Sequence, residues 1–199
     1  MVHRITGFPF LTMTSLSQPP VFSIQDADLV WQPIADYGNA PGQYWMPWLR
    51  DPGSLTQLLK ARSEQQFSVQ VLDESWQSRL PVALRREFGP VAEDHKFWSR
   101  QVLLKGRGVP WVMAHTLIPK HSLQGKLQQL LELSTQPLGE FLFSQPGLLR
   151  AGLEITPAGE SGWGRRSVFI LHNKPIMVAE FFLPALLDDV PETQDAGAS

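Results

Sequence analysis

Two charged residues interrupt segments that are otherwise apolar in this 199-residue chain. Arg100 lies in the segment FWSRQVLL, where strand alternation would place it in one row with Trp98, Val102 and Leu104. A guanidinium in an apolar row is costly unless an anion pairs with it. A structural salt bridge or a side chain that extends to the sheet edge would meet this demand. A substrate carboxylate bound by the planar guanidinium would meet it equally well.

Glu180 makes the matching demand in the segment PIMVAEFFLP. This segment is apolar on both faces of a strand, which is typical of a strand buried on both sides. A carboxylate in that setting should have a perturbed pKa or a cationic partner. Two interpretations stay open from the pattern: Glu180 pairs with Arg100, or it hydrogen-bonds a bound ligand or moves a proton on that ligand.

His115 and Arg166 are weaker candidates for the same site. His115 lies on the apolar face of a predicted strand, where a satisfied core histidine is the simpler interpretation and a site residue the alternative. Arg166 follows the segment Gly-Trp-Gly-Arg and starts a predicted strand. It is either a solvated charge at a strand edge or a second cationic contact for a dianionic ligand.

Several functional classes are disfavoured by what the chain lacks. There are no cysteines, which excludes disulfides, thiol nucleophiles and thiolate metal sites and fits a reducing compartment. The histidines show no metal-ligand spacing, and neither a glycine-rich phosphate loop nor a nucleophile elbow is present. A net charge of −2 offers no broad basic field for nucleic acid. We expect no metal, no membrane insertion and a cytoplasmic location.

Hydrophobic periodicity predicts an α+β fold with a single antiparallel sheet of about six strands and helices on one face. A capping-box pattern, Ser54 with Gln57, predicts the start of the first helix. The turns between the hairpin strands are predicted at Gly106–Gly108 and at Asn173–Lys174. The predicted strands span residues 67–72, 97–104, 110–118, 148–155, 166–172 and 175–183. The other predicted helices span residues 82–88, 123–131 and 137–142.

Composition divides the chain into three parts. Residues 1–45 are rich in Pro, Gly, Ser and Gln and are expected to form an irregular leader that partly wraps the domain rather than a signal peptide. Residues 46–187 form the predicted catalytic domain. Residues 188–199 are acidic, small and proline-broken, which predicts a disordered tail.

The order of five segments resembles one family, the chorismate pyruvate-lyases of ubiquinone biosynthesis. The resemblance extends from about Trp48 to Leu187. Each segment alone is weakly specific, whereas the five in this order are specific. The segments are FWSRQVLL ending at Leu104, GVPWVMAHTLIP ending at Pro119, QPLGEFLF ending at Phe143, GWGRRSVF ending at Phe169 and KPIMVAEFFLP ending at Pro184.

The resemblance implies a monomer with a buried site under helical flaps. The implied activity removes pyruvate from chorismate and leaves 4-hydroxybenzoate, without metal or cofactor. Arg100 would then hold the ring carboxylate, and Glu180 would lie next to the ring hydroxyl. Leu138 and Leu55 would each contribute a backbone N–H. Both stand in the first turn of a predicted helix, where N–H groups have no intrahelical partner.

One departure from the family leaves the second carboxylate of chorismate unassigned. An arginine often stands in the family where this chain has His115, so Arg166 becomes a rival candidate for the enolpyruvyl carboxylate. A small-molecule-sensing domain of the same fold, without catalysis, is the alternative function, and a product-binding carrier is a third. We expect Arg100 and Glu180 to lie at opposite ends of one aromatic ligand rather than in direct contact.

Overall fold

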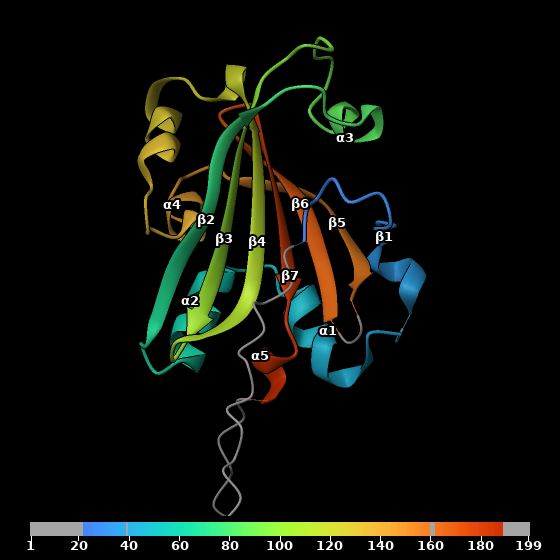
Figure 1. The fold of residues 1–199 in the computed structure, drawn as a ribbon, viewed down its shortest axis with the longest axis vertical. Coiled ribbons are helices and arrows are strands. Elements are labelled where there is room, and N and C mark those ends of the chain that lie inside the picture. Colours follow the sequence, from blue (N-terminus) through green and yellow to red (C-terminus); the bar gives the residue numbers. More distant parts are fainter. Residues whose placement is uncertain (1–21, 39, 160–161, 189–199) are drawn as a thin grey trace, which may run out of the picture.

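The computed structural model describes residues 22–38, 40–159 and 162–188. Within these residues, one antiparallel sheet of seven strands in the order β1-β5-β6-β7-β4-β3-β2 forms the centre of the molecule (Figure 1). The strands are β1 (Gln32–Pro33), β2 (Phe67–Gln77), β3 (Phe97–Gly106), β4 (Val109–Pro119), β5 (Leu149–Ala158), β6 (Gly162–Leu171) and β7 (Lys174–Phe182).

The predicted α+β fold is confirmed, with one strand more than the six expected. The additional strand, β1, lies in the segment predicted to be an irregular leader and pairs with the edge strand β5, with Gln32 opposite Ile155. A two-residue strand is too short to show an alternating pattern. The leader up to residue 21 and the tail from residue 189 lie outside the described residues.

Two tight hairpins bring the central strands together. The β3–β4 turn consists of Arg107 and Gly108, with φ values of 49° and 81°. The β6–β7 turn consists of His172 and Asn173, with φ values of 51° and 58°. Two successive positive φ values suit the right-handed twist of paired strands. The second turn lies one residue earlier than predicted, because Lys174 already pairs with the last residue of β6.

Helices α2, α3 and α4 lie where helices were predicted, whereas α1 and α5 were not predicted. Ser54 is the N-cap of α2, but its hydroxyl makes no cap hydrogen bond, so the capping box is not formed. The segment predicted as a helix over 123–131 is mainly 3-10. The helices are α1 (Gly42–Arg50), α2 (Leu55–Arg62), α3 (Val82–Arg86), α4 (Leu138–Phe143) and α5 (Ala185–Asp188), with 3-10 segments at Ile34–Tyr37, Lys120–Ser122 and Gly125–Glu132.

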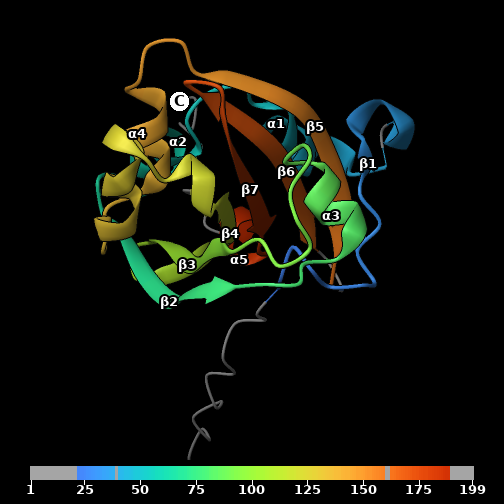
Figure 2. The ribbon, with the colours of Figure 1, turned by 90° about the horizontal axis from the view of Figure 1, so that it is seen from above.

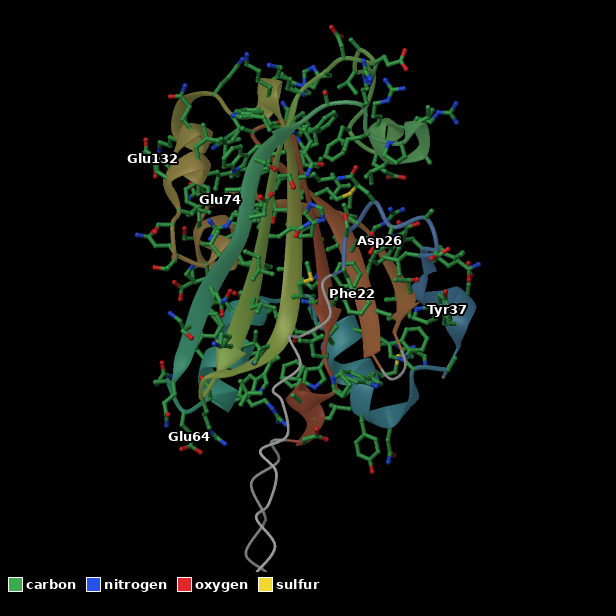
Figure 3. The ribbon with its side chains drawn as sticks, in the orientation of Figure 1. Phe22, Asp26, Tyr37, Glu64, Glu74 and Glu132 are labelled. Carbon is green, nitrogen blue, oxygen red and sulfur yellow. The ribbon has the colours of Figure 1, made fainter. Side chains whose placement is uncertain are left out.

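Both faces of the sheet are covered. Helices α1, α2 and α4 lie over the face that carries Val102 and Ala114, which we call the cavity face (Figure 2). Helix α3 and the segment 22–31 cover the opposite face. The helices were expected on one face of the sheet, and α3 is on the other. Figure 3 shows Phe22 of that segment in front of the strands, where it stacks on Phe181 at 5.1 Å between ring centroids. Strands that are apolar on both faces need cover on both.

Close packing at the end of β3 generates a stability prediction. A Cβ added to Gly106 would lie 2.2 Å from two ring carbons of Trp111, whose side chain is fully buried. Gly106→Ala should therefore lower the free energy of unfolding by about 1–3 kcal/mol through overpacking. Chemical denaturation measures this cost, and Trp111→Phe in the same chain should recover part of it. An unchanged denaturation midpoint in the single variant would contradict the packing described.

Candidate active site

A cavity lies between the cavity face of the sheet and the first turns of α2 and α4. The space within it where the centre of a water molecule could lie is about 50 Å³. Most of its lining is apolar, and the lining residues include a single cation, Arg100, and a single anion, Glu180. The other lining residues are Thr56, Val69, Val102, Leu104, Ala114, Thr116, Pro137, Leu138, Gly139, Leu142, Phe143, Phe169 and Val178.

Strand register places the two charges apart on the floor of this cavity. Arg100 of β3 pairs with Thr116 of β4, and Thr116 pairs with Val178 of β7. Glu180 lies two residues further along β7. Two inter-strand steps of about 4.8 Å and two residues of about 3.4 Å separate the Cα atoms of Arg100 and Glu180 by about 12 Å. The side chains therefore approach one cavity from different places, and each has a partner of its own.

Arg100 is neutralised by β2 and by the loop before α4. Its Nη1 atom lies 2.6 Å from Oε1 of Glu74, which Figure 3 labels on β2. Its Nη2 atom donates to the carbonyl oxygens of Ser134 at 2.6 Å and Gln136 at 3.3 Å. The side chain is only 4% exposed, and burial lowers the pKa of Arg100, with Glu74 opposing that effect. The structural salt bridge considered for Arg100 therefore exists, and the residue still lines the cavity.

Glu180 is neutralised by β6. Arg165 is its cross-strand neighbour, and Nε of Arg165 lies 2.5 Å from Oε2 of Glu180. The arginine is 1% exposed, while the glutamate side chain is 16% exposed and reaches the cavity. Since Oε2 is engaged, Oε1 is the oxygen that can accept a hydrogen bond from a ligand.

The covering helices meet at the cavity with their N-terminal ends. Leu138 is the first residue of α4 and lines the cavity. Leu55 is the first residue of α2, and although its side chain packs in the core, the next residue, Thr56, lines the cavity. A Cβ on Gly139 would lie 2.7 Å from Oγ1 of Thr56, so the two helix starts are in close contact. First-turn N–H groups of both helices are thus available next to the cavity.

His115 and Arg166 lie on the opposite face of the sheet, away from this cavity. His115 is fully buried, with Nδ1 accepting from the Ile24 N–H at 3.1 Å and Nε2 lying 2.9 Å from the Ser99 hydroxyl. Arg166 pairs with Glu154 at 2.7 Å and stacks on Trp31 at 5.0 Å. The reason is strand alternation: Thr116 and Arg165, their neighbours in sequence, take the cavity side.

Four residues of the site were missed from sequence. Arg165 and Glu74 hold the two charges, and the hydroxyls of Thr56 and Thr116 border the cavity. The available signal for Arg165 was the alternation that placed it opposite to Arg166. Nothing local identified Glu74, because a bulge between Val71 and Asp73 shifts the β2 register and brings Glu74 opposite Arg100.

No group of three or more His, Cys, Asp or Glu side chains is arranged to hold a metal ion among the residues that the structure describes. None of the described helices is long and apolar enough to cross a membrane.

A mostly apolar cavity with a few convergent polar groups is the typical form of a small-molecule site. Residues 26–191 match the family model described as chorismate lyase, and the chain belongs to this family. It is 34% identical over 174 residues to the probable chorismate pyruvate-lyase 2 of Pseudomonas fluorescens, covering 81% of this chain and 92% of that protein. It is 36% identical to the chorismate pyruvate-lyase of Cronobacter sakazakii over 70% of this chain and 80% of that protein.

A third curated relative matches almost end to end. The probable chorismate pyruvate-lyase of Shewanella sp. strain MR-7 is 33% identical, covering 92% of this chain and all of that protein. Among solved structures, a transcriptional regulator of the GntR family from Bacillus cereus superposes with a TM-score of 0.44 at 12% identity, over 60% of this chain and 93% of that one.

The buried histidine generates a pH prediction. Burial lowers the pKa of His115 to about 4, against a smaller opposing effect of Asp73. Between pH 6.5 and 4 the unfolded chain binds a proton at this residue that the folded chain does not bind, so the free energy of unfolding falls as pH falls through this window. The contribution of His115 should be a loss of about 2 kcal/mol between pH 7.5 and 5.

Urea denaturation of His115→Gln at both pH values measures this loss, since glutamine can still accept from Ile24 N–H and donate to Ser99. The variant should lose less stability on acidification than the wild type, by that amount. His172→Asn is the matched control, because His172 is exposed in the β6–β7 turn and asparagine tolerates its positive φ. Equal pH dependence in His115→Gln and the wild type would exclude the buried neutral imidazole.

Proposed function

We propose that this chain is a chorismate pyruvate-lyase that converts chorismate into 4-hydroxybenzoate and pyruvate, an early step of ubiquinone biosynthesis. The observation that carries the proposal is the arrangement of Arg100 and Glu180 at separate places in one apolar cavity, in a member of the chorismate lyase family. We further propose a cytoplasmic monomer that needs no cofactor. The absence of cysteines supports a reducing compartment.

The cavity supports one orientation of the substrate. The ring carboxylate is held by the guanidinium of Arg100 and by the first-turn N–H groups at Leu138 and Leu55. The ring hydroxyl, on the opposite ring carbon, donates to Glu180. The apolar lining accepts the ring itself. Glu74 and two backbone carbonyls take three of the five N–H groups of Arg100, and the two others bind the carboxylate. Leu55 takes part only through its backbone, since its side chain is buried in the core.

The chemistry is an elimination that makes the ring aromatic. The ring carbon–oxygen bond breaks, its electron pair goes to the departing oxygen, and the hydrogen of the hydroxyl-bearing carbon is lost as the third ring double bond forms. That hydrogen passes directly to the enolpyruvyl methylene, which becomes the methyl group of pyruvate, or Glu180 relays it as a general base and acid. In either route the protein binds a reactive conformation and excludes water.

Turnover of chorismate tests the proposed function directly. Purified protein incubated with chorismate and excess EDTA should release 4-hydroxybenzoate and pyruvate in equal amounts, measured by chromatography and by a lactate dehydrogenase-coupled assay. The control is the double variant Arg100→Ala with Glu180→Ala, with its fold checked by circular dichroism. A folded wild-type chain that forms no product would favour a ligand-sensing domain without catalysis.

The two charges should have separable kinetic effects. Arg100→Ala should raise KM about 10- to 100-fold, because a charge-assisted hydrogen bond to the carboxylate is lost. Lys105→Ala removes a cation from the same strand outside the cavity and should leave KM unchanged. Glu180→Gln keeps a hydrogen-bond acceptor but abolishes general-base action, so a kcat near that of the wild type would exclude the relay. A large loss of kcat would show that the carboxylate of Glu180 is needed, either to relay the hydrogen or to position the hydroxyl.

A further inference from the structure

Arg165 lies directly behind Glu180 and does not line the cavity. Its Nε atom binds Oε2 of Glu180 at 2.5 Å. Its Nη1 atom donates to the carbonyl oxygens of Trp48 at 2.7 Å and Asp51 at 3.0 Å, at the C-terminal end of α1. Free carbonyls at a helix C-terminus favour a cation. One buried guanidinium therefore fixes the orientation of Glu180 and the start of the segment that leads to α2.

A second arginine extends this cluster. Nε of Arg150 donates to the Ser167 hydroxyl at 2.9 Å, and its Nη1 donates to the Asp51 carbonyl at 3.1 Å. Burial and the neighbouring Arg165 lower the pKa of Arg150, while Glu180 and Asp51 raise it. The four side chains thus interact electrostatically, and their formal charges cancel. Glu180 is the only member of this neutral cluster that lines the cavity.

Neutrality at this end of the cavity matters for a dianion. In chorismate the second carboxylate is attached, through the ether oxygen, to the carbon next to the hydroxyl-bearing carbon. A substrate with its hydroxyl on Glu180 therefore brings that carboxylate close to Glu180. Two like charges about 7 Å apart in a partly buried site would weaken binding by about tenfold or more. Arg100 is the only cation among the lining residues that the structure describes, and in the proposed orientation it binds the ring carboxylate.

We propose that Arg165, supported by Arg150, positions Glu180 and cancels its charge, so that the hydroxyl end of the cavity accepts the second carboxylate of a dianionic ligand. This inference rests on the proposed function, since it takes the substrate orientation from it. Arg165 is a positioning residue, because it acts through Glu180. The product, which has lost the second carboxylate, does not benefit from this cancellation. Arg165 therefore selects for the substrate over the product.

Two matched ligands isolate this effect from a merely structural one. The monoanion is 4-hydroxybenzoate, and the dianion is 3-(carboxymethoxy)-4-hydroxybenzoate, which adds an ether-linked carboxylate beside the hydroxyl. Their dissociation constants are measured by calorimetry for the wild type, Arg165→Met, Arg165→Lys, Glu180→Gln and the double variant. Arg165→Met should weaken the dianion about tenfold more than the monoanion. Arg165→Lys, which keeps the charge, should change the ratio of the two constants by less than about threefold.

The double variant closes the cycle. Glu180→Gln alone should favour the dianion relative to the wild type, and adding Arg165→Met should return the ratio to near the wild-type value. If Arg165→Met does not fold, the step from Glu180→Gln to the double variant is the test, and it should again weaken the dianion selectively. An equal change for both ligands at that step, or in Arg165→Met itself, overturns the inference and leaves Arg165 a structural residue.

The failure of this inference is distinguishable from failure of the proposed function. A wild-type chain that converts chorismate, with ligand ratios that do not respond to Arg165, contradicts only the inference. Suppose instead that the ratio of the two dissociation constants changes in the Arg165 variants as expected, but the wild-type chain releases no pyruvate from chorismate. That result contradicts only the catalytic proposal.

Discussion

Two opposite charges share one apolar cavity, and each must be neutralised locally because their backbones are about 12 Å apart. Arg100 is paired by Glu74 from β2, and Glu180 is paired by Arg165 from β6. Both partners are cross-strand neighbours on the same face of the sheet. The register of the β2–β3 and β6–β7 pairs, including the bulge in β2, therefore decides which charges neutralise Arg100 and Glu180.

The same two arginines connect the sheet to the segments that cover it. Arg100 binds the carbonyls of Ser134 and Gln136, just before α4 begins. Arg165 binds the carbonyls of Trp48 and Asp51 at the C-terminal end of α1, in the segment that leads to α2. The segments that lead into α2 and α4 are thus each held by a buried guanidinium: Arg100 lines the cavity, and Arg165 lies behind Glu180.

On the opposite face of the sheet, the buried polar residues hold covering segments in place. His115 accepts from the backbone of Ile24 and so fastens the segment 22–31 over strands that would otherwise expose apolar side chains. Because burial holds the pKa of His115 well below its usual value, the imidazole is neutral and suits a dry interface. Arg166 is likewise occupied, by carboxylates on β5 and next to α3. Neither residue is placed to contact a ligand in the cavity.

Sequence alone determined the longer strands of this protein and the faces of their side chains, because both follow from local periods. Alternation identified the six longer strands, grouped Glu180 with Val178 and Phe182, and separated Arg165 from Arg166. It also singled out Arg100 and Glu180 as charges that need partners. Only the tertiary structure decided which partners they have and which face carries the cavity. Strand order and the β2 bulge bring residues 15 and 26 positions apart into contact, and such non-local pairing leaves no periodic signal in the sequence.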